Sequence, residues 1–498
     1  MARTPVARSV STLYGTKVPT AEEYRRKLAQ YEALGSSGHS DVSHETLSSL
    51  DHEKAVVVNR YIDMNACSVL GFDVDYTLTQ WKPTLQAFLF SEAMSSLVQD
   101  RGYPRELLQS EFDPEFPIRG LHFDAKHGTL LKLNAFYDIC HECAYLGKER
   151  LSLDQLRSLY GGTHVRDPHS RSLRSLDDHF SLAEACLLAE CIHYFRSHGY
   201  SFAPEFIHQD VTEAVRRVHV TGALHQELVS RLPYYLHRDE PLRDFMRSAQ
   251  AQGKQSFILT NSPYWFVDAG LRYIIGDDWN DFFDIVITRA NKPTFFTADT
   301  PFRTIISDLD CPQIAEQERV SWRAVRSMEK GERFVAGSLT RLVAATGWEG
   351  SSVLYLGDSL RADAAWPGQL QSWRTGVIIP ELSHELRLQH TPEYQHLLDK
   401  VIVLEQLKAD AEWIQEAELP RGTTDFLRAE NAALRSHLRE VASPTFGSVF
   451  RGRYLATLFM RTLEQADLYT AKVTNLGEVL DKRLYSRRRF LPHEVGGD

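Results

Sequence analysis

The chain has 498 residues, of which 43% are hydrophobic and 24% charged, an ordinary composition for a globular protein of about two to four domains. No apolar run approaches the roughly 18 residues that cross a bilayer, so we expect no membrane partner. The net charge of −10 argues against a general nucleic-acid binder, which is usually basic.

Residues 1–45 are predicted to form an N-terminal extension that is either disordered or a targeting segment. The first 21 residues contain no acidic side chain, and they carry Arg3, Arg8 and Lys17 among several serines and threonines. This pattern fits a mitochondrial transit peptide and fits an unstructured tail equally well. The six cysteines are sparse for this length and indicate a reducing compartment. We expect a cytoplasmic protein, with a mitochondrial location as the alternative.

A loop is expected at residues 35–40 (GSSGHS), after which short apolar runs alternate with helical stretches. The runs cover residues 68–72, 256–259, 283–287, 352–356 and 376–379. Each is apolar without alternation, as expected for strands that are covered on both faces. A helix is predicted over 264–275, between the second and third runs. This order of elements predicts an α/β fold with a doubly wound parallel sheet.

The long stretch between the first and second runs has helical patterns at 182–195 and 211–229, and it predicts a mainly helical cap. After residue 400 the apolar spacing predicts a helical bundle or a short coiled coil, interrupted at residues 420–422. We therefore expect a first core part at 46–164, the cap at 165–240, a second core part at 241–400 and a helical C-terminal region at 401–498.

Cys140 and Cys143 form a CxxC motif. A zinc site would need a second pair of ligands near in space, and the sequence does not show one clearly. We interpret the two residues as buried thiols on a helix in preference to a metal or redox site.

Polar side chains follow four of the predicted strands, at the point where each strand ends or shortly after it. In chain order they are Asp73, Asp75, Thr260, Asn261, Lys292, Asp358 and Asp363. Because the carboxyl ends of parallel strands lie at one edge of a sheet, these side chains are expected to converge. Any one of these signals has an ordinary explanation, such as a turn, a helix cap or a surface loop. Four of them in this order favour a site for chemistry.

The residue types suit phosphoryl transfer. A carboxylate can attack phosphorus and form an acyl phosphate, while a second carboxylate acts as general acid and then as general base. Clustered carboxylates repel a phosphate unless a cation intervenes, and Mg²⁺ binds oxygen ligands of this kind. A lysine with hydroxyl or amide donors can neutralise and orient the phosphoryl oxygens.

The motifs resemble those of the haloacid dehalogenase superfamily, and within it the cytosolic purine 5′-nucleotidase family with its 5′-nucleotidase domain-containing relatives. The likeness extends from about residue 57 to 494. It rests on the segments 71–78, 118–121, 130–133, 292–296, 354–358, 372–375 and 380–382. Near the end of the chain, the segments 446–451, 466–469 and 491–494 resemble the domain-containing branch.

The resemblance implies that Asp73 is the nucleophile and that Asp75 is the general acid and base. It implies a Mg²⁺ ion held by Asp73, the backbone carbonyl of Asp75 and Asp358, with Asp363 supporting the metal from behind. It implies three phosphate-binding side chains, which are Thr260, Asn261 and Lys292.

The cap departs from the purine enzymes. The arginine and aspartate that contact the base there correspond to Thr212 and Arg216 in this chain, while Phe180 and His219 remain as candidate contacts to a base. Elsewhere the usual histidine after Gly-Asp is Ser359, and residues 367–371 lack the usual basic run. These changes put recognition of a 6-oxopurine in doubt and leave the phosphate chemistry intact.

We therefore predict a Mg²⁺-dependent hydrolase of a nucleoside 5′-monophosphate or another small phosphate ester. The protein could assemble as a homo-oligomer. Two alternatives stay open. A phosphotransferase that passes the phosphoryl group to a nucleoside would use the same residues. A catalytically weak scaffold that works through its helical tail would have kept only the fold.

Overall fold

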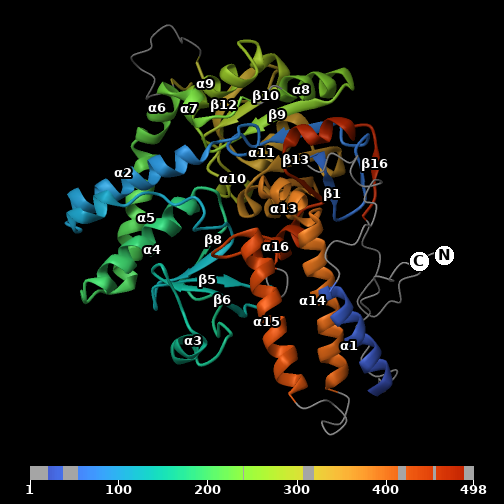
Figure 1. The fold of residues 1–498 in the computed structure, drawn as a ribbon. Coiled ribbons are helices and arrows are strands. Elements are labelled where there is room, and N and C mark those ends of the chain that lie inside the picture. Colours follow the sequence, from blue (N-terminus) through green and yellow to red (C-terminus); the bar gives the residue numbers. More distant parts are fainter. Residues whose placement is uncertain are drawn as a thin grey trace, which may run out of the picture.

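A computed structural model describes residues 21–36, 54–238, 241–306, 319–412, 422–451 and 456–486. Within these ranges the chain forms a nine-stranded central sheet, a five-stranded second sheet and helices around both (Figure 1). The predicted mixed α/β class is confirmed. None of the described helices is long and apolar enough to span a membrane.

The central sheet has the order β1-β15-β14-β13-β3-β9-β10-β12-β11. Its parallel strands are β15 (Leu468–Thr470), β14 (Arg374–Ile378), β13 (Val353–Gly357), β3 (Val69–Phe72), β9 (Gln255–Leu259), β10 (Ile285–Thr288) and β12 (Glu332–Ala336). The edge strands β1 (Val56–Val58) and β11 (Phe302–Thr304) pair antiparallel with their neighbours. The five apolar runs are β3, β9, β10, β13 and β14, and their side chains are buried on both faces, which confirms the predicted parallel sheet.

Helices connect and cover these strands. The predicted helix after the second run is α9 (Tyr264–Ile274). Other helices of the core are α8 (Pro241–Ala251), α10 (Thr294–Thr297), α11 (Leu339–Thr346), α12 (Ala365–Gln371) and α13 (Glu381–Gln389). Of these helices, α9 was the one predicted from the sequence, because its apolar side chains recur at helical spacing.

The insertion between β3 and β9 contains helices and a sheet. Its helices include α2 (Pro83–Arg101), α4 (Ser181–Ser197), α5 (Pro204–Val220), α6 (Ala223–Ser230) and α7 (Leu232–Tyr235). The helix predicted at 182–195 is α4. The one predicted at 211–229 is two helices, because Gly222 adopts a left-handed φ of 78° between α5 and α6.

The sheet of the insertion was missed by the prediction of a mainly helical cap. It has the antiparallel order β7-β6-β5-β4-β8, formed by β4 (Leu121–Asp124), β5 (Thr129–Leu133), β6 (Ile139–Leu146), β7 (Glu149–Arg150) and β8 (Leu173–Leu176), with α3 (Leu153–Tyr160) beside it. Because β8 pairs with β4, this sheet spans the boundary that we placed between residues 164 and 165. Strands β4 and β5 are buried throughout and therefore lack the alternation of a half-exposed strand.

The same sheet corrects the interpretation of the CxxC motif. Cys140 and Cys143 lie on strand β6 and not on a helix. Cys143 is buried, and its Sγ atom contacts the Phe446 carbonyl at 3.5 Å. Among the described residues, the one cluster with the geometry of a metal site lies elsewhere in the molecule.

The C-terminal region begins with a helical hairpin that projects from the body of the protein (Figure 1). It consists of α14 (Pro392–Ala411) and α15 (Thr423–Ala442), which pack through Leu404, Leu427 and neighbouring apolar side chains. The predicted bundle is thus confirmed, and the predicted break at 420–422 falls largely outside the described residues. Beyond it, α16 (Thr457–Gln465) and β15 return to the core, so the region also supplies a strand to the central sheet.

Part of the N-terminal extension is a third helix of this bundle. Helix α1 (Ala21–Ser36) buries Tyr24 and Tyr31 against the hairpin. Tyr31 donates a 2.6 Å hydrogen bond to Glu430, and Lys27 pairs with Asp410 at 2.5 Å. The helix also includes the start of the loop predicted at 35–40. The basic first 20 residues, on which the targeting prediction rests, lie outside the described residues.

Candidate active site

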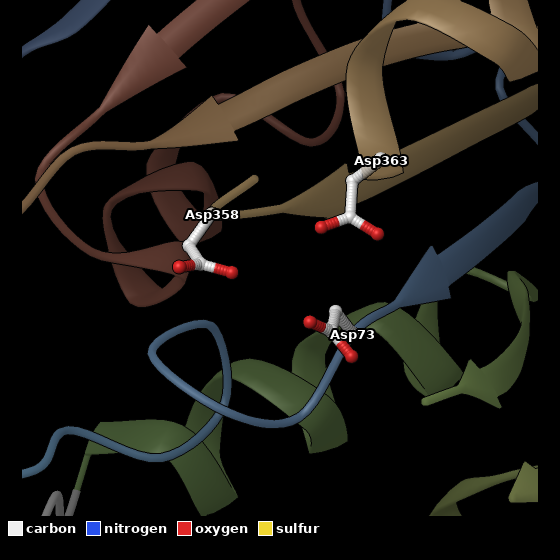
Figure 2. A group of neighbouring side chains, drawn as sticks. All are labelled: Asp73, Asp358 and Asp363. Carbon is white, nitrogen blue, oxygen red and sulfur yellow. The ribbon is translucent and has the colours of Figure 1, made fainter. Parts of the chain in front are cut away.

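Three buried carboxylates meet at the carboxyl edge of the central sheet. Asp73 follows β3, Asp358 follows β13, and Asp363 lies in the single π-helical turn η6 (Leu360–Ala364) that comes next. One oxygen of each lies within 4.8 Å of the others (Figure 2). Since β3 and β13 are parallel neighbours, their ends are brought together by the sheet itself, as the sequence predicted.

Lys292 connects two of these carboxylates. Its Nζ lies 2.6 Å from Asp363 Oδ1 and 2.9 Å from Asp73 Oδ1, and its side chain is only 2% exposed. The contact with Asp363 is a hydrogen bond, whereas the contact with Asp73 is an ion pair without hydrogen-bond alignment. Tyr355, on β13, completes the group, since its hydroxyl lies 3.1 Å from both Lys292 Nζ and Asp363 Oδ1.

The electrostatics of this group follow from burial and from like charges. Burial and the charges of Asp73 and Asp363 raise the pKa of Asp358 well above its ordinary value. Burial also raises the pKa of Asp363, to about 6, although Lys292 opposes that shift. Burial alone would lower the pKa of Lys292, but Asp363 and Asp73 outweigh it and the pKa is raised. When all three carboxylates are ionised, one ammonium leaves an excess of negative charge, which a bound cation would offset.

Asp75 is held apart from the three-carboxylate group. Trp81 Nε1 donates to its Oδ1 at 3.1 Å, and Ser262 Oγ donates to its Oδ2 at 2.5 Å. Burial, followed by the charge of Asp73, raises the pKa of Asp75 to about 6. A carboxyl group with this pKa can release and take up a proton near neutral pH, as general acid–base catalysis requires.

Asn261 contacts the backbone of Lys292 with both ends of its side chain. Its Oδ1 accepts from the Lys292 N–H at 2.6 Å, and its Nδ2 donates to the Lys292 carbonyl at 3.1 Å. The predicted phosphate ligand thus also positions the lysine. Thr260 is buried at the end of β9, and its Oγ1 accepts from the N–H of Ser262 at 3.2 Å.

The candidate base contacts lie in a line of aromatic side chains that starts in the turn after β3. Tyr76 directly follows Asp75 and meets Phe180 edge-on at 5.4 Å between ring centroids. Phe180 in turn meets His219 edge-on at 5.3 Å. The structure therefore brings both predicted side chains of the cap into one aromatic group next to the site.

The two substituted cap positions are occupied by internal contacts. The Thr212 hydroxyl donates a 2.9 Å hydrogen bond to buried Glu184, which also lies 3.5 Å from Arg174. Arg216 is exposed and makes two hydrogen bonds to Glu213 on its own helix. The Thr212 donor is therefore already engaged, whereas Arg216 keeps N–H donors beyond the two that bind Glu213.

Several residues of the site were not given a role by the sequence. Tyr355 lies within the apolar run 352–356, and Ser262 directly follows the predicted phosphate ligand Asn261. Trp81 had no signal, because it reaches Asp75 through a turn rather than through regular structure. Arg119, which lies behind Asp358, belongs to the segment 118–121 and was noted only for its likeness to relatives.

A buried carboxylate group with a lysine, at the carboxyl edge of a parallel sheet, is the arrangement of an α/β phosphohydrolase. Residues 56–496 match the model of the 5′ nucleotidase family. The chain is 36% identical over 464 residues to a 5′-nucleotidase domain-containing protein of Dictyostelium discoideum, covering 91% of this chain and 76% of that one. It is 34% identical over 474 residues to human 5′-nucleotidase domain-containing protein 2, covering 93% and 89%.

Among solved structures, the chain is similar to CbbY from Rhodobacter sphaeroides in complex with phosphate. The TM-score is 0.22 at 13% identity, covering 63% of this chain and 86% of that one. The family match and the relatives show that the chain belongs to the 5′-nucleotidase family. It is a phosphoric monoester hydrolase, as the motifs predicted.

Proposed function

We propose that the protein hydrolyses a nucleoside 5′-monophosphate with Mg²⁺, through an aspartyl-phosphate on Asp73. The observation that carries the proposal is the charge of the site. Asp73, Asp358 and Asp363 place three carboxylates within 4.8 Å of one another, and Lys292 supplies one positive charge. With all three carboxylates ionised, two negative charges remain, and they match one divalent cation. Oxygen ligands of this kind favour Mg²⁺, which binds through one or two carboxylates and keeps several waters.

The oxygen donors of the site divide into those that would bind the metal and one that would position its surroundings. Asp73 and Asp358, with the backbone carbonyl of Asp75, would hold the ion. Asp363 is already engaged, because it accepts hydrogen bonds from Lys292 and from the Ser359 N–H. Its role would be to orient the lysine and the turn behind the metal. When bound, Mg²⁺ would neutralise the phosphoryl oxygens and so permit an anionic nucleophile to approach an anionic substrate.

In the first half-reaction, a carboxylate oxygen of Asp73 attacks phosphorus and the bond from phosphorus to the ester oxygen breaks. Asp75 donates its proton to that oxygen, so a neutral alcohol leaves. In the second half-reaction, Asp75 takes a proton from water, the water oxygen attacks the phosphorus of the acyl phosphate, and Asp73 is released with inorganic phosphate. Lys292, with Thr260 and the Asn261 segment, would orient the phosphoryl oxygens.

A scaffold function would leave the carboxylate group unexplained. Like charges buried together destabilise a fold unless they bind something, and the charges here are concentrated where a ligand would sit. The cap supports a nucleoside as the leaving group, because Phe180 and His219 form part of an aromatic surface beside Tyr76. An aromatic face can stack on any base.

The test is phosphate release from a panel of nucleoside monophosphates and simple sugar phosphates, with Mg²⁺ and with a chelator. We expect phosphate release from at least one nucleotide with Mg²⁺ and no phosphate release above background in chelator. A parallel reaction with an added nucleoside identifies the phosphoryl acceptor, because transfer would yield a new nucleotide in place of phosphate. Release that is unaffected by the chelator would contradict the proposal.

A further inference from the structure

A buried ion pair lies directly behind the Asp358 turn. Arg119 precedes β4 in the insertion, and Glu381 begins α13 in the core. The guanidinium makes two hydrogen bonds to the carboxylate, from Nε to Oε1 at 2.7 Å and from Nη2 to Oε2 at 2.8 Å. The Arg119 side chain is 2% exposed and that of Glu381 is 28% exposed. The pair thus joins the insertion to the core across the edge that carries the site.

The guanidinium also reaches the backbone of the proposed metal ligand. Arg119 Nη1 donates to the carbonyl of Asp358 at 3.4 Å, which is a long contact that a small rotation would shorten. This contact places a permanent positive charge beside Asp358, in addition to the charge of Lys292. Arginine suits the position because its planar fork can satisfy Glu381 with two donors and still direct a third elsewhere.

The backbone that carries Arg119 is fixed. Gly120 follows it with a left-handed φ of 84°, and a Cβ atom there would lie 2.8 Å from Leu458 Cβ. The Gly120 N–H donates to the Leu176 carbonyl at 2.7 Å, which ties the position to strand β8. The arginine therefore extends from a rigid point, and movement of its guanidinium would be transmitted to the Asp358 turn.

We propose that Arg119, aligned by Glu381, is a positioning residue that holds the Asp358 turn in the geometry needed to bind the divalent cation. This inference rests on the proposed function, since it assigns a role toward the proposed metal. Partners that orient a metal ligand from behind commonly contribute a factor of about 10 to 100 in metal affinity. The pair would supply that contribution from the insertion, which makes metal binding depend on the docking of the cap-bearing segment.

The test compares a charge-neutral double variant with a matched control. Arg119→Gln with Glu381→Gln removes both charges together. A single substitution at Arg119 would instead leave the Glu381 carboxylate without its partner. The control is Arg374→Gln with Asp467→Asn. That pair has side chains that are 32% and 5% exposed and a 3.0 Å contact, but Arg374 starts β14 and so lies at the opposite end of the sheet from Asp358.

The measurements on the full chain are the Mg²⁺ dissociation constant by calorimetry and the rise in Tm on adding Mg²⁺. We expect the Arg119/Glu381 variant to bind Mg²⁺ at least about tenfold more weakly and to lose most of the Tm rise. The control should keep both values, even if its metal-free Tm falls. Wild-type Mg²⁺ affinity in the Arg119/Glu381 variant would overturn the inference.

A conservative variant keeps the test decisive if the double variant does not fold. Arg119→Lys retains the charge but cannot make the three directed contacts, and it should also weaken Mg²⁺ binding. An unchanged dissociation constant in this variant would equally overturn the inference. Failure of the proposed function would be distinguishable, because it would appear as an absence of Mg²⁺ binding in the wild-type protein itself.

Discussion

Replacement of Asp73 by asparagine should abolish turnover and leave the fold intact. The amide is nearly isosteric with the carboxylate but cannot attack phosphorus. Losing the covalent route should cost on the order of 5 kcal/mol or more in transition-state stabilisation, which lowers kcat/KM by at least about a thousandfold. The same substitution removes one negative charge from the proposed Mg²⁺ site.

The structure indicates why stability should change little. At an effective dielectric constant of about 20, charges 4.8 Å apart repel by about 3.5 kcal/mol, so Asp73 is repelled by about 7 kcal/mol in total when Asp358 and Asp363 are both ionised. At 2.9 Å, Lys292 attracts it by about 6 kcal/mol. Because these contributions nearly cancel, we expect a metal-free Tm within a few degrees of the wild-type value.

The assay is phosphate release on the best substrate of the panel, with thermal unfolding of each variant in chelator. The matched control is Asp299→Asn, at an aspartate that is 66% exposed and pairs with Arg341 on the surface. This control should keep wild-type activity, because an exposed pair contributes at most about 1 kcal/mol to stability and lies outside the site. Activity of Asp73→Asn within tenfold of wild type would refute the nucleophilic role.

Three further predictions concern the metal, Asp75 and the cap. Ca²⁺ should substitute poorly for Mg²⁺ in phosphate release, because it takes more ligands and would draw both oxygens of Asp73 onto the metal; equal rates with the two ions would count against the proposed ligand set. Burial raises the pKa of Asp75 to about 6, so the metal-free wild type should lose up to about 3 kcal/mol of stability relative to Asp75→Asn as pH rises from about 4 to 6. Denaturant unfolding in chelator measures the free energy of unfolding of both proteins against pH. The same pH dependence in the two proteins would contradict the prediction. Because the Thr212 hydroxyl donates to Glu184 and Arg216 pairs with Glu213, kcat/KM should not favour IMP or GMP over AMP and UMP. A preference for IMP or GMP above a hundredfold would contradict the roles given to Thr212 and Arg216.

The core strands and the residues at their carboxyl ends were predictable, because they follow from the spacing of apolar residues and from the order of strands and helices along the chain. Strands buried on both faces read as continuous apolar runs, and parallel strands must end at one edge, so the convergence of Asp73, Lys292 and Asp358 could be expected without a structure. The closeness of Asp363 to Lys292 depends in addition on the turn after β13. Its π-helical geometry left no mark in the spacing of apolar residues.

What the sequence did not predict depends on contacts between distant segments. Strand β8 has only the weak pattern LRSL and exists because β4 lies beside it, so neither the second sheet nor its extent was foreseen. The docking of α1 on the hairpin places Tyr31 beside Glu430, far along the chain. The pairing of Arg119 with Glu381 is likewise non-local, and its donors are assigned only by three-dimensional geometry.

In the proposed mechanism, Asp73 carries the phosphoryl group during turnover. This role is tested most directly by mixing the full chain with Mg²⁺ and its best substrate, quenching in acid, and measuring peptide masses after digestion. We predict a peptide that contains Asp73 and is heavier by one phosphoryl group. The added mass should disappear on treatment with hydroxylamine and should be absent from Asp73→Asn. A phosphoryl group on any other residue during active turnover would contradict this mechanism.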